Sequence, residues 1–252
     1  QQVPFDRKPM HLPDDATLSH REELNEGLYR PELATLAANA KLHMRQALVD
    51  SPLFTLEALQ DSLLAYFPQS IVERFADAIS AHPLGINIAR TMLTNRIVGD
   101  AGATWLSELH MQTGRRSDHI IASYLQACQL LSADTLKAQI SALETPLDAE
   151  TEYSIRLIIE DAIEGVTNGI LRSTNPVTEN FAAGFNAVLE LLPTLMPAED
   201  LAKREAATDA MASYLPRALA ERISMLNHYE EALDIARIVE LVEQPVEHAG
   251  KA

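Results

Sequence analysis

The stretch HMQTGRRSDHIIASYLQA, from His110 to Ala127, indicates the fold because it joins two helical segments at a single glycine. A helical pattern runs into Gly114, two arginines follow, and Ser117 opens a second apolar-periodic segment. Glycine directly after a helix is a common stop signal, since it adopts the left-handed conformation at low cost. The same arrangement, with basic residues at the start of the second helix, is also typical of DNA-binding helix-turn-helix motifs.

The rest of the sequence repeats this alternation of helical periodicity with proline or glycine breaks. Pro31 is expected at the first position of a helix that ends before Pro52. Its apolar positions fall on one face: Leu33, Leu36, Ala37, Ala40 and Met44. No segment alternates apolar and polar residues for long enough to indicate a strand. We therefore predict an all-α fold, an irregular array of roughly a dozen helices joined by short turns marked by proline or glycine.

The break at Asn175 and Pro176 is the clearest candidate boundary within this array. It predicts a main helical domain over residues 1–175 and a second helical subdomain over residues 176–252.

Composition argues against a DNA-binding protein. The chain has 252 residues, with 20 basic and 36 acidic side chains and a net charge of −16. Duplex DNA is bound largely through neutralisation of its phosphates, which requires a concentrated basic face. Between residues 86 and 130 four arginines are nearly balanced by three acidic residues. We therefore expect no nucleic-acid partner.

Other global features indicate a cytoplasmic protein. Its single cysteine, Cys128, cannot form an internal disulfide and fits a reducing compartment. No apolar run approaches the roughly 20 residues of a membrane-spanning helix. The first residues, QQVPFDRKPMHLPDD, lack the pattern of a signal peptide. We therefore expect no membrane association.

Catalytic signatures are sparse. Gly99 and Gly102 follow no strand, so a helix end with a turn is favoured over a phosphate-binding loop. Cys128 lies on an apolar helical face and is interpreted as a buried thiol. His110 and His119 flank the glycine turn, but a zinc site needs further ligands.

Glu160 and Glu164 are one helical turn apart, with Asp161 beside them. Such carboxylates can act in acid–base chemistry, but a solvated helix face is the favoured interpretation. Trp105 is interpreted as a core anchor.

The arginines after the glycine turn, Arg115 and Arg116, could contact phosphate or pair with carboxylates on a neighbouring helix, and the charge balance favours the second. If the Gly114 turn is a structural helix-helix corner, Gly114→Val should lower thermal stability, whereas Arg115→Ala should barely change it.

Two stretches resemble the C-terminal helical region of the large bacterial NAD-specific glutamate dehydrogenases: GLYRPELATLAANAKL at residues 27–42, and residues 66–127, which begin YFPQSIVERFADAISAHPLG. The family carries a similar RPEL opening, a similar Tyr-Phe-Pro step and a Thr-Gly turn like Thr113–Gly114. Residues 214–240, YLPRALAERISMLNHYEEALDIARIVE, resemble its Leu-Pro step and Ala-Leu-Asp-Ile helix.

The resemblance implies a parent enzyme that oxidatively deaminates L-glutamate to 2-oxoglutarate and ammonia while reducing NAD. In this family an upstream domain handles glutamate, NAD and the catalytic lysine. The present segment would then carry no catalytic, cofactor-binding or metal-binding residue. It would supply packing, oligomer contacts in a homo-oligomer, or regulation, with the upstream domain as its partner. The alternative is a free-standing helical interaction module that grips a partner helix or peptide.

Overall fold

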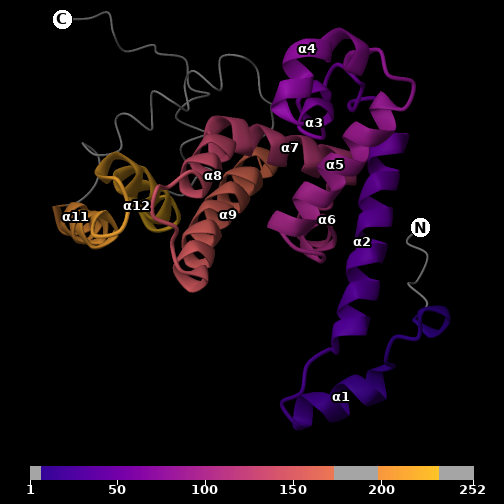
Figure 1. Ribbon diagram of the computed structural model, residues 1–252. Helices are drawn as coiled ribbons and strands as arrows, with labels where there is room; N and C mark the ends of the chain where they lie inside the picture. Colours follow the sequence, from indigo (N-terminus) through magenta and orange to yellow (C-terminus); the bar gives the residue numbers. More distant parts are fainter. Residues whose placement is uncertain (1–6, 173–197, 233–252) are drawn as a thin grey trace, which may run out of the picture. The chain divides into compact units, whose positions relative to one another are not determined.

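The computed structural model describes residues 7–172 and 198–232 (Figure 1). These residues form eleven α-helices and one short 3-10 helix and contain no strand, which confirms the all-α prediction. The elements are η1 (Lys8–Met10), α1 (Asp15–Glu23), α2 (Arg30–Asp50), α3 (Gln60–Leu64), α4 (Gln69–Ser80), α5 (Gly85–Asp100), α6 (Trp105–Thr113), α7 (Ser117–Leu130), α8 (Ala133–Ser141), α9 (Ala149–Arg172), α11 (Ala198–Ala212) and α12 (Arg217–Ala232). None of these helices has the length and apolar character of a membrane span.

Capping side chains and prolines set the helix boundaries. Asp14 caps α1 by accepting a hydrogen bond from the Thr17 amide at 2.9 Å, and Asp148 caps α9 through the Thr151 amide at the same distance. Such caps satisfy amides that have no partner within the helix. Pro68 immediately precedes α4, and Pro31 occupies the second position of α2 rather than the first. The helix begins one residue earlier than predicted because Glu32 accepts the Tyr29 amide.

The chain divides into two compact units, residues 1–108 and residues 109–252. The boundary predicted at residues 175 and 176 lies outside the described residues, so it stays a prediction.

In the first unit, α5 is the central helix and packs against α2 and α3. Its inner face is fully buried through Ala89, Leu93 and Ile97. The start of α5 approaches α3 so closely that a Cβ on Gly85 would lie 3.3 Å from the Leu63 side chain. Trp105 is also buried, as predicted for a core anchor.

In the second unit, α9 is the central helix and packs against α7, α8 and α12. Its buried isoleucines and valine recur every three or four residues, as expected for one face of a helix: Ile155, Ile159, Ile163, Val166 and Ile170. Each such side chain contributes about 1.5–3 kcal/mol when removed from water. The neighbouring helices α11 and α12 are joined by a hydrogen bond of 2.6 Å between the buried hydroxyls of Thr208 and Ser224.

The apolar face predicted for α2 is buried only in part. Met44 and Leu48, in the C-terminal half, are inaccessible to solvent, whereas Leu33 in the first turn is 51% exposed. The face is continuous in the sequence, but α5 covers only its C-terminal half.

A clasp joins α1 to the first turn of α2. The Arg21 guanidinium donates to the Glu32 carboxylate at 2.8 Å, and the same carboxylate oxygen accepts the Tyr29 amide at 2.7 Å. The guanidinium also lies over the Tyr29 ring, 4.1 Å from its centre. The hydrogen bond from Arg21, followed by that from the Tyr29 amide, holds the pKa of Glu32 below its ordinary value.

We expect Glu32→Gln to lower the thermal midpoint at neutral pH and to have little effect in acid. A carboxyl whose pKa is depressed by folding stabilises the protein above its unfolded pKa, about 4.3, and loses that contribution as the pH falls through its folded pKa. Thermal unfolding from pH 7 down to strongly acidic pH measures the difference. Glu22→Gln, an exposed position on α1, is the control and should show no such pH dependence. If Glu32→Gln lowers the thermal midpoint as much in acid as at neutral pH, the clasp does not stabilise the protein electrostatically.

Candidate functional site

The corner between α6 and α7 is held by a dense set of local hydrogen bonds. Gly114 has a φ of +66°, and its amide donates to the His110 carbonyl at 2.9 Å. Thr113 Oγ1 donates to the Leu109 carbonyl at 2.6 Å and accepts the Arg115 amide at 3.2 Å. The predicted left-handed glycine is therefore confirmed.

Arg115 ties this corner to the end of α9. Its Nε donates to the carbonyl of Leu171 at 3.1 Å, which satisfies one of the terminal carbonyls that lack a partner within the helix. The interpretation that Arg115 pairs with a carboxylate on a neighbouring helix was wrong, because the end of α9 offers backbone carbonyls at this point. A cation beside a helix C-terminus also interacts favourably with the helix dipole.

Arg116, which directly precedes α7, pairs with the first turn of α7 instead of with a neighbouring helix. Its Nε and Nη2 donate to the two carboxylate oxygens of Asp118 at 3.1 and 2.9 Å. Asp118 is buried, so the pair neutralises a carboxylate at the first turn of α7. The inner face of α7, including Ile120, Ile121 and Tyr124, lies in the core. A helix with this face buried and its entry arginine paired is poorly suited to read a DNA groove.

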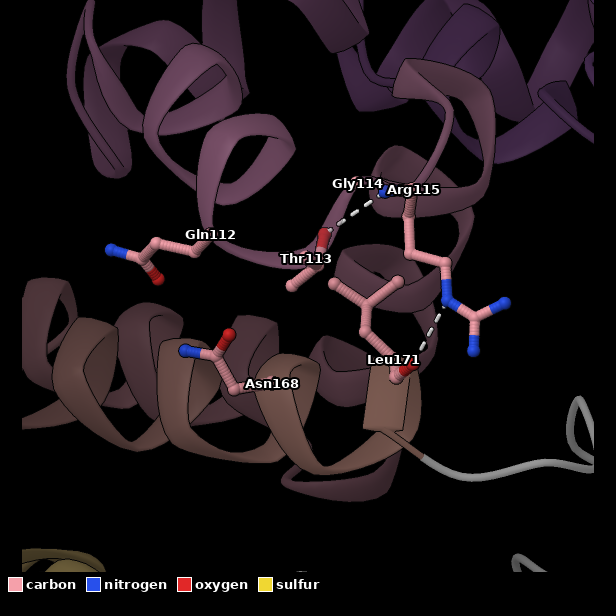
Figure 2. Close-up of a pocket in the computed structure, with 6 residues that line it drawn as sticks. All are labelled: Gln112, Thr113, Gly114, Arg115, Asn168 and Leu171. Atoms are coloured by element: carbon pink, nitrogen blue, oxygen red, sulfur yellow. Dashed lines mark hydrogen bonds between the residues drawn. The ribbon is translucent and has the colours of Figure 1, made fainter.

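A pocket of about 500 Å³ opens at this corner (Figure 2). Figure 2 shows the amides of Gln112 on α6 and Asn168 on α9 at one end of the pocket and Arg115 at the other. Thr113, Gly114 and Leu171 complete its lining.

The pocket does not fit the pyrophosphate of a dinucleotide. Such a group is bound by free backbone amides at a helix N-terminus. Here the amides of Gly114 and Arg115 already donate within the corner, and the carboxylate of Asp118 lies in the first turn of α7. A pyrophosphate would therefore meet backbone amides that are already engaged. The hydrogen bonds of Thr113, Gly114 and Arg115 hold the corner together.

The other residues singled out from the sequence are described one by one. Cys128 is buried, as predicted. Gly102, with a φ of +96°, follows the end of α5, which confirms the interpretation as a helix end with a turn. His110 Nδ1 lies 2.7 Å from the Arg115 carbonyl. In the described ranges no three histidine, cysteine or acidic side chains are grouped as metal ligands.

The carboxylates of α9 have divergent environments. Asp161 and Glu164 are exposed, as expected of a solvated face. Glu160 is not, because it forms an ion pair with Lys137 of α8 in which both side chains are only 13% exposed. Its Oε2 also accepts a hydrogen bond of 3.3 Å from the Tyr124 hydroxyl of α7. The solvated-face interpretation was therefore wrong for Glu160, which connects three helices.

Sequence reasoning missed this Lys137–Glu160–Tyr124 network, and it also missed the Arg21–Glu32 clasp. A partial signal was present for the first: Glu160 is one residue from Ile159, a buried position of the same helix. Nothing in the local pattern of α8 identifies Lys137 as its partner.

Comparison with known proteins places these helices in a family. The sequence matches the family described as "Glutamate dehydrogenase, C-terminal" over residues 25–252. The chain belongs to this family. The resemblance seen in the RPEL, Tyr-Phe-Pro and Thr-Gly segments is thus confirmed.

Individual relatives are NAD-specific glutamate dehydrogenases from bacteria. The chain is 27% identical over 229 residues to the one from Mycobacterium tuberculosis, covering 89% of the chain and 14% of the relative. It is 25% identical over 237 residues to that of Halomonas elongata, covering 92% and 15%. The match to the Pseudomonas aeruginosa enzyme is 26% over 151 residues, covering 60% and 9%. This member of the family thus spans only a small part of these relatives' length.

We expect Gly114→Val to lower the free energy of unfolding by about 2 kcal/mol, because a branched side chain is disfavoured at positive φ. Arg115→Ala should cost about 1 kcal/mol through loss of the contact with the end of α9. This expectation replaces the negligible effect that the sequence suggested.

Urea unfolding of both variants measures these differences. The control is Gly27→Val, at a glycine with no atom within 4 Å of an added Cβ and no positive φ. A Gly114→Val protein as stable as the control would show that α6 ends without needing a left-handed residue.

Lys137→Met should lower the free energy of unfolding by about 3 kcal/mol, because it leaves the Glu160 carboxylate largely buried without its cation. Replacing both residues by Met should restore much of that loss, since two apolar side chains can fill the space. Urea unfolding of the single and double variants tests the pair.

The matched control is Lys203→Met on α11, where the lysine is exposed and pairs with Glu199 and Asp200. Exposed pairs contribute about 0–1 kcal/mol, so this variant should resemble the parent. Equal effects at positions 137 and 203 would argue against the buried network.

Proposed function

We propose that this chain is a C-terminal helical segment of a large NAD-dependent glutamate dehydrogenase and that it carries no catalytic residue. The observation that carries the proposal is the family match over residues 25–252, combined with relatives of which the chain spans 14% and 15%. In the parent enzyme L-glutamate and water would give 2-oxoglutarate and ammonia, with reduction of NAD. Glutamate and NAD would bind upstream of this segment.

The contacts of the second unit support a packing role. The side chains best equipped for chemistry are engaged with one another or with backbone atoms: Lys137 with Glu160, Tyr124 with Glu160, and Arg115 with the Leu171 carbonyl. The first two contacts join different helices, and the third joins the turn between α6 and α7 to the end of α9. They fix the geometry of α7, α8 and α9, which is what a scaffold within a larger enzyme requires.

The contacts around the corner pocket support the proposal that NAD binds outside this segment. The pocket's backbone amides at Gly114 and Arg115 already donate within the corner, so they offer the pyrophosphate of NAD no free cradle. The proposal therefore assigns NAD to the upstream domain of the same polypeptide. Cytoplasmic localisation, amino-acid catabolism and assembly of the parent enzyme into a homo-oligomer are parts of this proposal.

The full-length polypeptide encoded by the reading frame should reduce NAD with L-glutamate, and the 252-residue chain alone should not. Absorbance of NADH at matched molar concentrations of the two proteins measures this. Turnover by the 252-residue chain would place the active site within it and overturn the proposal. A reading frame without an upstream dehydrogenase would favour the free-standing helical interaction module.

Two variants of the full-length polypeptide test the non-catalytic role directly. His119→Ala and Asp161→Asn alter exposed side chains that the sequence singled out for chemistry. Both should leave kcat/KM unchanged, since removal of an acid or base from a reacting centre lowers it by about 10²-fold or more. A loss of that size in either variant, with the thermal midpoint unchanged, would assign this segment a part in the reaction.

A further inference from the structure

The apolar stripe of α2 is longer than the surface that buries it. At 100° per residue, Leu33, Ala37, Ala40, Met44 and Leu48 fall on one face of the helix. Met44 and Leu48 are buried in the packing with α5. Leu33 is 51% exposed, and Ala37 and Ala40 are only half-buried. The uncovered part, from Leu33 to Ala40, is continuous with the established α2–α5 contact.

This uncovered part differs from ordinary surface leucines. Leu42, on the same helix, is 65% exposed and lies on the opposite face, away from the stripe. Isolated exposed leucines such as Leu42 are common and need no explanation. An apolar row that begins in the core and emerges into solvent is instead the pattern of a face that another apolar surface covers.

The clasp between Arg21 and Glu32 indicates where that surface comes from. The family match begins at residue 25, so α1 lies just before it. Arg21 of α1 donates to Glu32 at 2.8 Å, and both side chains are only about 15% exposed. The segment preceding the family region is therefore anchored at the first turn of α2, one residue from Leu33.

We propose that the stripe from Leu33 to Ala40 is the docking surface for an apolar helix of the upstream, dehydrogenase-bearing part of the same polypeptide. This inference rests on the proposed function. It adds the contact through which the helical segment is joined to the rest of the enzyme.

Tethering favours this occupant over a second copy of the chain. A surface joined by a short linker encounters its partner at an effective concentration of about 1 mM. A second copy would have to reach the same concentration in solution to compete. The Arg21–Glu32 clasp holds α1 beside the first turn of α2, at the exposed end of the stripe.

The test compares two cysteine variants, Leu33→Cys and Leu42→Cys, in the full-length polypeptide and in the 252-residue chain. Maleimide labelling at each position is followed by mass spectrometry of the corresponding peptide. Both changes are small and replace exposed side chains, so the fold should persist. Cys128 is buried and its protection in every sample verifies this.

Position 33 should label about tenfold more slowly in the full-length polypeptide than in the 252-residue chain, for an effective concentration of about 1 mM and an intrinsic dissociation constant of about 0.1 mM. Position 42 should label at the same rate in both. This pair of results would support docking on the stripe.

Equal labelling of position 33 in both proteins would overturn the docking proposal. If the full-length polypeptide with equal labelling still oxidises glutamate with NAD, the proposed function stands and only the docking proposal fails. Protection of position 33 in the 252-residue chain that grows with concentration would assign the stripe to a second copy and overturn the proposal. Protection of position 33 in the 252-residue chain at every concentration would mean that another part of the same 252 residues covers the stripe. That result would also overturn the docking proposal. A reading frame without a dehydrogenase would overturn both proposals.

Discussion

The second unit depends on the burial of one long helix. The 24 residues of α9 bring a row of β-branched side chains into the interior, and no single neighbour is long enough to cover them. Three helices, α7, α8 and α12, share that surface. The connection between α7 and α8 is only two residues long and turns at Ser132, which has a φ of +51°. At the other end of α7, the Arg115 contact with Leu171 ties the turn after the left-handed Gly114 to the end of α9.

Burial on several sides also explains why a charged network lies in this unit. Glu160 follows the fully buried Ile159, so its carboxylate is carried toward the interior with the rest of the helix. An isolated carboxylate there would be strongly disfavoured. Lys137 and Tyr124 provide a cation and a hydroxyl from two other helices, and the network then favours one register among the three. The same groups would be unremarkable on a solvated surface, where such pairs contribute little.

The local sequence pattern was sufficient to predict the helices but not which residues of different helices contact one another. Helix ends could be placed because glycine, proline and aspartate act through the backbone within a few residues of themselves, as Asp14, Pro68 and Gly114 do. The fate of Glu160 could not be deduced, since it is decided by Lys137, which lies 23 positions away on another helix. The partner of Arg115 is still more distant in sequence, at Leu171. The face of α2 was placed correctly, but periodicity shows only which side chains share a face and not how much of that face a neighbour covers.

The two units consequently differ in what their surfaces imply. In the second, polar groups that enter the interior, such as Thr208 and Ser224, find partners on adjacent helices of that unit. Apolar side chains remain in solvent in both units, such as Leu33 in the first and Met111 in the second, but the first also has an apolar row on α2 that starts in its core. Helix α4 buries Ile79 but leaves Phe75, four residues earlier, and Ile71, eight residues earlier, exposed, and its backbone departs from helical geometry at Phe75. A self-contained unit loses stability by leaving such rows uncovered, whereas a unit that contacts another part of a larger polypeptide needs them. On α2 the apolar row starts at buried residues and continues to Leu33 in solvent, and this continuity, rather than exposure alone, is what supports the proposed docking surface in the first unit.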